Sequence, residues 1–68
     1  MDRVELGKLI KIERIKKDMS QEELSERAGI SQSTLFFLES GRSNTRPQTI
    51  LKVLKALGVT DLKIEELI

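Results

Sequence analysis

The sequence contains two short helical segments joined by one glycine, within residues 20–41, and this pattern limits the folds that the chain can adopt. Residues 20–23 form a capping-box pattern, in which a serine hydroxyl can accept the backbone N–H three residues later. Gly29 ends the first segment, because glycine adopts the left-handed conformation of a helix terminus at little cost. Ser31 can cap the second segment, which ends at Gly41. A turn this tight predicts two helices that cross at a steep angle.

Apolar residues at helical spacing extend this pattern along the rest of the chain. They predict a first helix over about residues 3–17 and a fourth that follows a polar loop and ends at Leu57. Residues 45–48 form a second capping-box pattern with Thr45 as the cap, and proline is tolerated in the first turn. We expect a short fifth helix over residues 60–67.

The core follows from the same apolar stripes. It is predicted to contain Leu6, Leu9, Ile10, Leu24, Ala28, Ile30, Leu35, Leu38, Ile50, Val53, Leu54 and Leu57. No strand pattern is visible, and the joints between helical segments are short. The sequence therefore predicts an all-α fold, a compact five-helix bundle in a single domain over residues 1–68.

Composition excludes several classes of function. The chain has no cysteine and no histidine, which argues against disulfides, thiolate metal sites and the usual proton shuttle of enzymes. We therefore expect no enzyme activity, no cofactor, no metal and no small-molecule substrate. No apolar run approaches the roughly 20 residues that span a bilayer, and charge begins at once at the N-terminus. We expect a cytoplasmic protein without a membrane partner.

Charge gives an ambiguous signal. The formal net charge is only +1, whereas nucleic-acid-binding domains are often strongly basic. The cations are unevenly distributed: several lie in the first quarter of the chain, and Arg42 and Arg46 lie in one loop. An uneven distribution fits a nucleic-acid-binding surface, but it also fits an ordinary solvated helix face.

Taken together, residues 20–25, 29–31, 35 and 38–42 resemble the phage repressor and Cro family of helix-turn-helix domains, also called the xenobiotic-response-element type. The resemblance extends from about Leu6 to Val59. It implies a lambda-repressor-like DNA-binding domain that partners double-stranded DNA. In such a domain the helix after Ser31 enters the major groove.

The resemblance also implies roles for individual residues. At the start of the second helix, Gln21 is expected to contact a phosphate and to brace the recognition helix. Base edges are expected to meet Gln32, Ser33 and Phe37, with Thr34 and Phe36 flanking them. The phosphate backbone is expected to meet Arg42, Ser43, Asn44 and Arg46, the last of which can alternatively reach a minor groove. An ion pair buried between the first and third helices is expected from Arg14 and Glu39.

Ordinary structural explanations compete with these roles. Gln21 can act as a helix-capping residue, and the polar residues can simply be solvated. For Gln32 the chemistry itself favours DNA, because an amide pairs bidentately with adenine N6 and N7.

Phe36 and Phe37 are the only aromatic residues in the chain and are adjacent in the third helix. Neighbouring helical residues are about 100° apart, so at least one ring should be exposed. Three explanations remain: contact with thymine methyl groups, a protein interface, or packing beneath the loop from Arg42 to Arg46. We prefer the first for Phe37 and the third for Phe36.

The C-terminal segment, residues 58–68, carries an apolar cluster that can serve as a dimer interface. Its members are Val59, Leu62, Ile64, Leu67 and Ile68. The alternative is that this segment packs on its own core. The expected function is that of a repressor of transcription that binds a palindromic operator as a homodimer. The alternatives are an antitoxin-type regulator with a protein partner, or an interaction module that has lost DNA binding.

Overall fold

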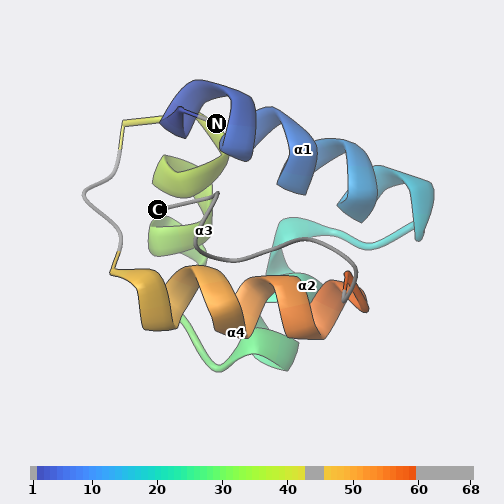
Figure 1. Cartoon of the computed structure of the whole chain (residues 1–68). Helices are drawn as coiled ribbons and strands as arrows, with labels where there is room; N and C mark the ends of the chain where they lie inside the picture. The colour runs from blue at the N-terminus through green and yellow to red at the C-terminus, as the bar shows by residue number, and fades with distance from the viewer. Residues whose placement is uncertain (1, 43–45, 60–68) are drawn as a thin grey trace.

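Four helices make up the regular structure of the chain in a computed structural model, which describes residues 2–42 and 46–59. They are α1 (Arg3–Lys16), α2 (Gln21–Ala28), α3 (Gln32–Glu39) and α4 (Pro47–Leu57) (Figure 1). The all-α prediction is confirmed. The described ranges hold four helices instead of the predicted five, and the segment expected to form the fifth, residues 60–67, lies outside them.

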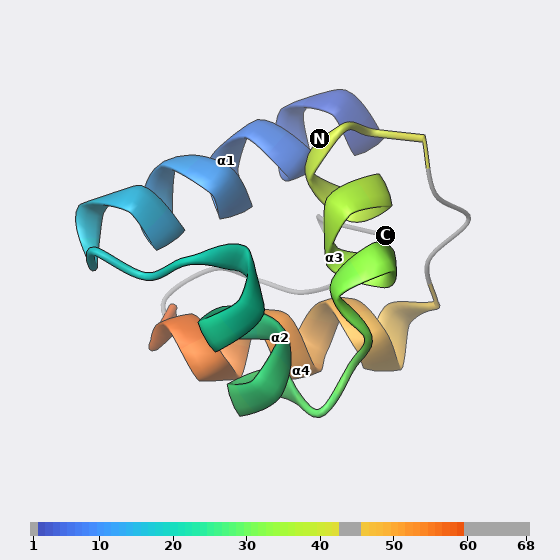
Figure 2. The ribbon, with the colours of Figure 1, turned by 180° about the vertical axis from the view of Figure 1, so that it is seen from behind.

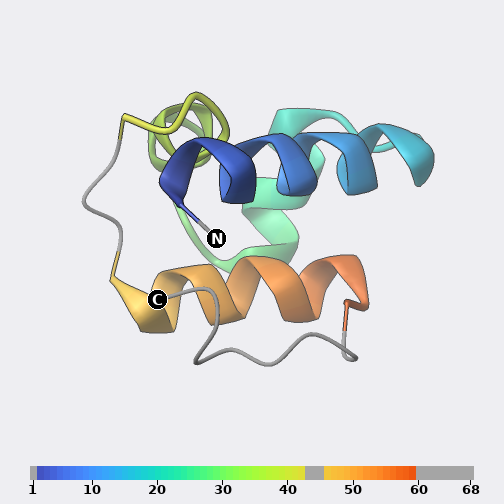
Figure 3. The same cartoon turned by 45° about the horizontal axis from the view of Figure 1, so that its top comes forward.

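The two short helices pack against the two longer ones, α3 against α1 and α2 against α4. In Figures 1 and 3, α1 and α4 run in the same general direction along opposite sides of the molecule. Helix α3 stands across both of them, and Figure 3 shows it almost end-on. Contacts between α1 and α3, between α2 and α4, and between α2 and α3 hold this arrangement together.

Local signals explain where three of the helices begin. Asp2 caps α1, because its carboxylate accepts the backbone N–H of Glu5 at 2.8 Å. The predicted cap of α2 is confirmed, with the hydroxyl of Ser20 3.0 Å from the backbone nitrogen of Glu23. The cap of α3 at Ser31 is likewise confirmed.

The predicted start of α4 was wrong by one residue. Its N-cap is Arg46 rather than Thr45, and Arg46 makes no capping hydrogen bond through its side chain. Pro47 occupies the first turn, as predicted. Proline fixes φ near the helical value and has no N–H to leave unpaired there, so the helix starts without a side-chain cap.

The buried core agrees closely with the predicted stripes. It consists of Leu6, Ile10, Met19, Leu24, Ala28, Leu35, Leu38, Ile50, Val53, Leu54 and Leu57. Ile30 is partly buried and packs against this cluster. Leu9 is only partly buried, and Met19 is a core residue that the stripes did not indicate.

A close approach of α1 to the end of α3 depends on Gly7. A Cβ atom at this position would lie 2.5 Å from the carbonyl oxygen of Glu39 and 2.6 Å from that of Leu38. Any side chain there would therefore push the two helices apart. The backbone contact fixes α3 on α1 and so fixes the direction in which the outer face of α3 points.

Candidate nucleic-acid interface

The turn between α2 and α3 is built as the sequence predicts. Gly29 has a φ of 70°, in the left-handed region, and follows the last turn of α2 directly. The backbone nitrogen of Ile30 donates to the carbonyl of Ser25 at 3.0 Å, which closes the end of α2. Figure 2 shows this turn and the short helices on either side of it. Four residues of α3 remain exposed and form its free face: Gln32, Ser33, Phe36 and Phe37.

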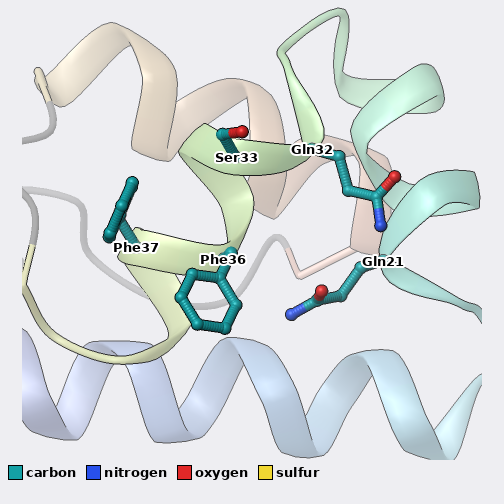
Figure 4. Close-up of a pocket in the computed structure, with 5 residues that line it drawn as sticks. All are labelled: Gln21, Gln32, Ser33, Phe36 and Phe37. Atoms are coloured by element: carbon teal, nitrogen blue, oxygen red, sulfur yellow. The ribbon is translucent and has the colours of Figure 1, made fainter.

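An open hollow lies on that free face. It has a volume of about 340 Å³ and is lined by Gln21, Gln32, Ser33, Phe36 and Phe37. In Figure 4, the amides of Gln21 and Gln32 lie at one side of the hollow and the two rings at the other. The structure therefore brings together five of the residues that the sequence pointed to for DNA contact.

Both phenylalanine rings are exposed. Phe36 and Phe37 retain 51% and 46% of their accessible surface, respectively. Their ring centroids lie 5.5 Å apart with an interplanar angle of 72°, an edge-to-face contact. The ring of Phe36 lines the hollow beside Gln21, and half of its surface stays accessible (Figure 4). Packing of Phe36 beneath the Arg42–Arg46 loop stays a prediction, because residues 43–45 lie outside the described ranges. The exposure of Phe36 follows from its position next to Leu35, which is buried and already fills the core on that side of the helix.

An ion pair beneath the hollow joins α1 to α3. The Nε and Nη2 atoms of Arg14 lie 2.7 Å and 3.1 Å from the two carboxylate oxygens of Glu39. The side chains are only 12% and 4% exposed, respectively. Arg14 also donates from Nη1 to the carbonyl of Met19 at 2.8 Å. This planar, bidentate geometry is the arrangement in which a guanidinium and a carboxylate pair most strongly.

Gln21 is tied to this ion pair. Its Nε2 donates to Oε1 of Glu39 at 3.2 Å, so the residue on the rim of the hollow is hydrogen-bonded to the part-buried carboxylate. The family resemblance predicts that Gln21 braces the recognition helix and that Arg14 pairs with Glu39, but it does not predict Glu39 as the partner of Gln21. The only local signal was an amide side chain in the first turn of α2, which does not reveal a partner 18 positions away.

Other predicted contact residues lie outside the hollow. Thr34 is partly buried, and its hydroxyl lies 2.7 Å from that of Ser31 in the cap of α3. Arg42 follows α3 and Arg46 precedes α4, and both are exposed. Ser43 and Asn44 lie outside the described residues.

The predicted dimer segment is only partly described. Val59 is half-buried and packs against the core of its own chain. Leu62, Ile64, Leu67 and Ile68 lie outside the described ranges.

Surface charges near the ends of α1 and α2 are partly paired within the chain. Lys16 and Lys17 both lie within 4 Å of Glu13, at 3.5 Å and 3.7 Å. Arg27 lies 3.0 Å from Glu23. For these cations, the interpretation as an ordinary solvated helix face fits the geometry.

Two further observations bear on the classes of function weighed from composition. Within residues 2–42 and 46–59, no group of three or more acidic side chains is placed to hold a metal ion. None of the helices described is long and apolar enough to cross a membrane.

Comparison with known proteins agrees with this geometry. The family model described as Helix-turn-helix matches residues 10–64. The chain is also 39% identical over 51 residues to a protein of Sinorhizobium fredii (strain NBRC 101917 / NGR234) named "Uncharacterized HTH-type transcriptional regulator y4dJ". The match covers 75% of this chain and 66% of the relative, just under two thirds of its length. The chain therefore belongs to the Cro/C1-type helix-turn-helix family.

Proposed function

We propose that this chain is a sequence-specific DNA-binding regulator of transcription that inserts α3 into the major groove. The observation that carries the proposal is the hollow on the outer face of α3, where amide, hydroxyl and aromatic groups stand exposed together. The major groove of B-DNA is about 12 Å wide and admits one helix. Membership of the family and the name of the y4dJ relative support the same function.

The proposed contacts follow from the chemistry of each side chain. Gln32 pairs with an adenine edge, and Ser33 donates or accepts beside it. Gln21 contacts a phosphate with the part of its amide that Glu39 leaves available. Neighbouring phosphates are bound by Arg42, Ser43, Asn44 and Arg46, while Thr34 supports the start of α3.

The biological role that we propose is repression in the cytoplasm by a homodimer on a palindromic operator. One domain of this size covers little DNA surface, so two copies are needed to read two half-sites about one helical turn apart. The apolar residues 62, 64, 67 and 68 are the candidates for the contact between copies.

The test is selection from a randomised pool of 20-base-pair duplexes, followed by fluorescence anisotropy on the enriched duplex. We expect a palindrome, bound by two chains. Gln32→Ala should cost about 1–3 kcal/mol of binding and relax one position in each half-site. Gln48→Ala is the matched control, because Gln48 is also an exposed amide in the first turn of its helix, α4. Binding that stays weak and independent of sequence at low salt would refute the proposal.

A second candidate function is docking of a protein partner, as in an antitoxin-type regulator or an interaction module without DNA binding. It is favoured by the exposed ring pair, because clustered aromatic side chains are typical of protein interfaces. We prefer DNA binding as the function, because the rings share their hollow with two amides that suit base and phosphate contacts.

A further inference from the structure

Helix α3 presents an outer face without a cation. Residues 32–39 contain no lysine or arginine, and the one acidic side chain, Glu39, is occupied by Arg14 and Gln21. The groups exposed on this helix are therefore an amide, a hydroxyl and two rings. Guanine is read most often by arginine or lysine. Without lysine or arginine, α3 is suited to reading features of the base pairs other than the guanine edge.

Phe37 has no role in the core that would account for its size. Leu35 and Leu38, on either side of the ring pair, fill the buried face with 0% and 4% exposure. The ring of Phe37 neither donates nor accepts a conventional hydrogen bond, so it cannot read the donor and acceptor pattern of a base. The apolar group that an unmodified base pair presents in the major groove is the C5-methyl group of thymine.

Phe36 holds the ring of Phe37 at a defined angle. The edge-to-face contact, at 5.5 Å and 72°, restrains a side chain that is otherwise exposed on one side. Gln32 lies one helical turn before Phe36 and lines the same hollow. An amide suited to adenine thus stands next to an apolar wall suited to a methyl group.

We infer that Phe37, held by Phe36, recognises the C5-methyl group of a pyrimidine in the major groove. 5-Methylcytosine carries the same methyl group at the same ring position as thymine. The site therefore favours thymine over uracil and 5-methylcytosine over cytosine at the position that Phe37 contacts. This inference rests on the proposed function, since it names the chemical group that the reading helix selects.

The experiment uses the full chain and two duplex pools, one synthesised with thymidine and the other with deoxyuridine throughout. After selection from the thymidine pool, each thymine of the enriched duplex is replaced singly by uracil. Each cytosine is replaced singly by 5-methylcytosine. In each exchange only one methyl group differs. At one position per half-site, we expect the methyl group to tighten binding about four-fold, the factor for burying one methyl group.

Variants assign the effect to the ring. Phe37→Ala should bind the methylated and unmethylated duplexes equally, Phe37→Leu should keep most of the difference, and Phe36→Ala should reduce it. Thermal unfolding followed by circular dichroism checks that each variant is folded. Gln48→Ala should keep the full four-fold difference.

The outcomes separate this inference from the proposed function. Sequence-specific binding without methyl dependence at any position, or a methyl effect that survives in Phe37→Ala, would overturn the inference alone. Absence of specific binding to either pool at low salt would overturn both the inference and the proposed function. It would favour the second candidate function, in which the ring pair docks a protein partner.

Discussion

Glu39 connects the core to the reading surface through three donors. Two come from Arg14 and one from Gln21, and together they occupy both carboxylate oxygens. Desolvation makes such a pair expensive, so it need not stabilise the fold relative to apolar residues of similar size. Its clearer consequence is positional, because it locks the rim residue Gln21 to the helix that carries Phe36 and Phe37.

Removing one partner of this pair should be costly. Arg14→Met leaves the carboxylate of Glu39 part-buried without its cation, and we expect a loss of about 3–5 kcal/mol in the free energy of unfolding. The double variant Arg14→Met with Glu39→Leu should lose less than the single one. Urea unfolding measures both. Arg27→Met is the matched control, since it breaks a surface pair worth about 0–1 kcal/mol. Equal losses in Arg14→Met and Arg27→Met would contradict the assignment.

Individual residues also show what could be predicted of the site. The five residues that line the hollow were each indicated by the family resemblance, with Gln32 supported by its own chemistry. The orientation of Phe36 was not predictable, because it depends on how fully Leu35 fills the core. The bond from Gln21 to Glu39 joins residues far apart in sequence and becomes visible only when α2 and α3 are packed.

At the scale of elements, the contact between α1 and α3 is the most demanding in the fold. Gly7 lets the backbone of α1 reach the last carbonyls of α3. In an exposed helix interior, alanine in place of glycine is stabilising by about 0.8–1.0 kcal/mol. Here the added Cβ would meet backbone oxygens, which cannot move aside as a flexible side chain would.

Gly7→Ala should therefore lower the free energy of unfolding by about 1–3 kcal/mol, the usual cost of overpacking. It should also weaken DNA binding, because α3 would tilt. Chemical unfolding and anisotropy on the selected duplex measure the two effects. Lys8→Ala is the control, at the next and exposed position of α1, and should change stability by less than about 0.5 kcal/mol. A stabilised Gly7→Ala variant would show that the helices separate freely.

Helix boundaries could be predicted where a signal is local and could not be predicted where several registers compete. Ser20, Gly29 and Ser31 act on backbone groups within three or four residues, so the sequence alone locates them. At α4 the sequence pattern predicts Thr45 as the cap, whereas Pro47 in the first turn favours a start one residue later, with Arg46 at the N-cap. The role of Gly7 carries no local signal, because its contact partners belong to another helix.

At the scale of the whole molecule, charge limits how the domain can hold DNA. The net charge is only +1, and Lys16, Lys17 and Arg27 face carboxylates within the chain. The cations that follow α3 in the loop before α4 are Arg42 and Arg46, and both are exposed. In the proposed complex, the binding free energy must therefore come largely from base contacts, with a small electrostatic contribution from phosphates.

A shallow dependence of binding on salt should follow. Each neutralised phosphate contributes about −0.9 to the slope of log K against log salt concentration. In the proposed homodimer, two arginines from each chain therefore predict a slope of roughly −4. Arg42→Ala should reduce the slope by about 2 in the dimer and weaken binding evenly across sequences, whereas Gln32→Ala should leave the slope unchanged. Anisotropy titrations from low to physiological salt measure this slope.

A slope near −10 would mean that cations elsewhere on the domain contact DNA, and the exposed lysines of α1 would be the first to substitute. A slope near zero would mean that neither arginine meets a phosphate, and that the groove-facing contacts of α3 supply the affinity.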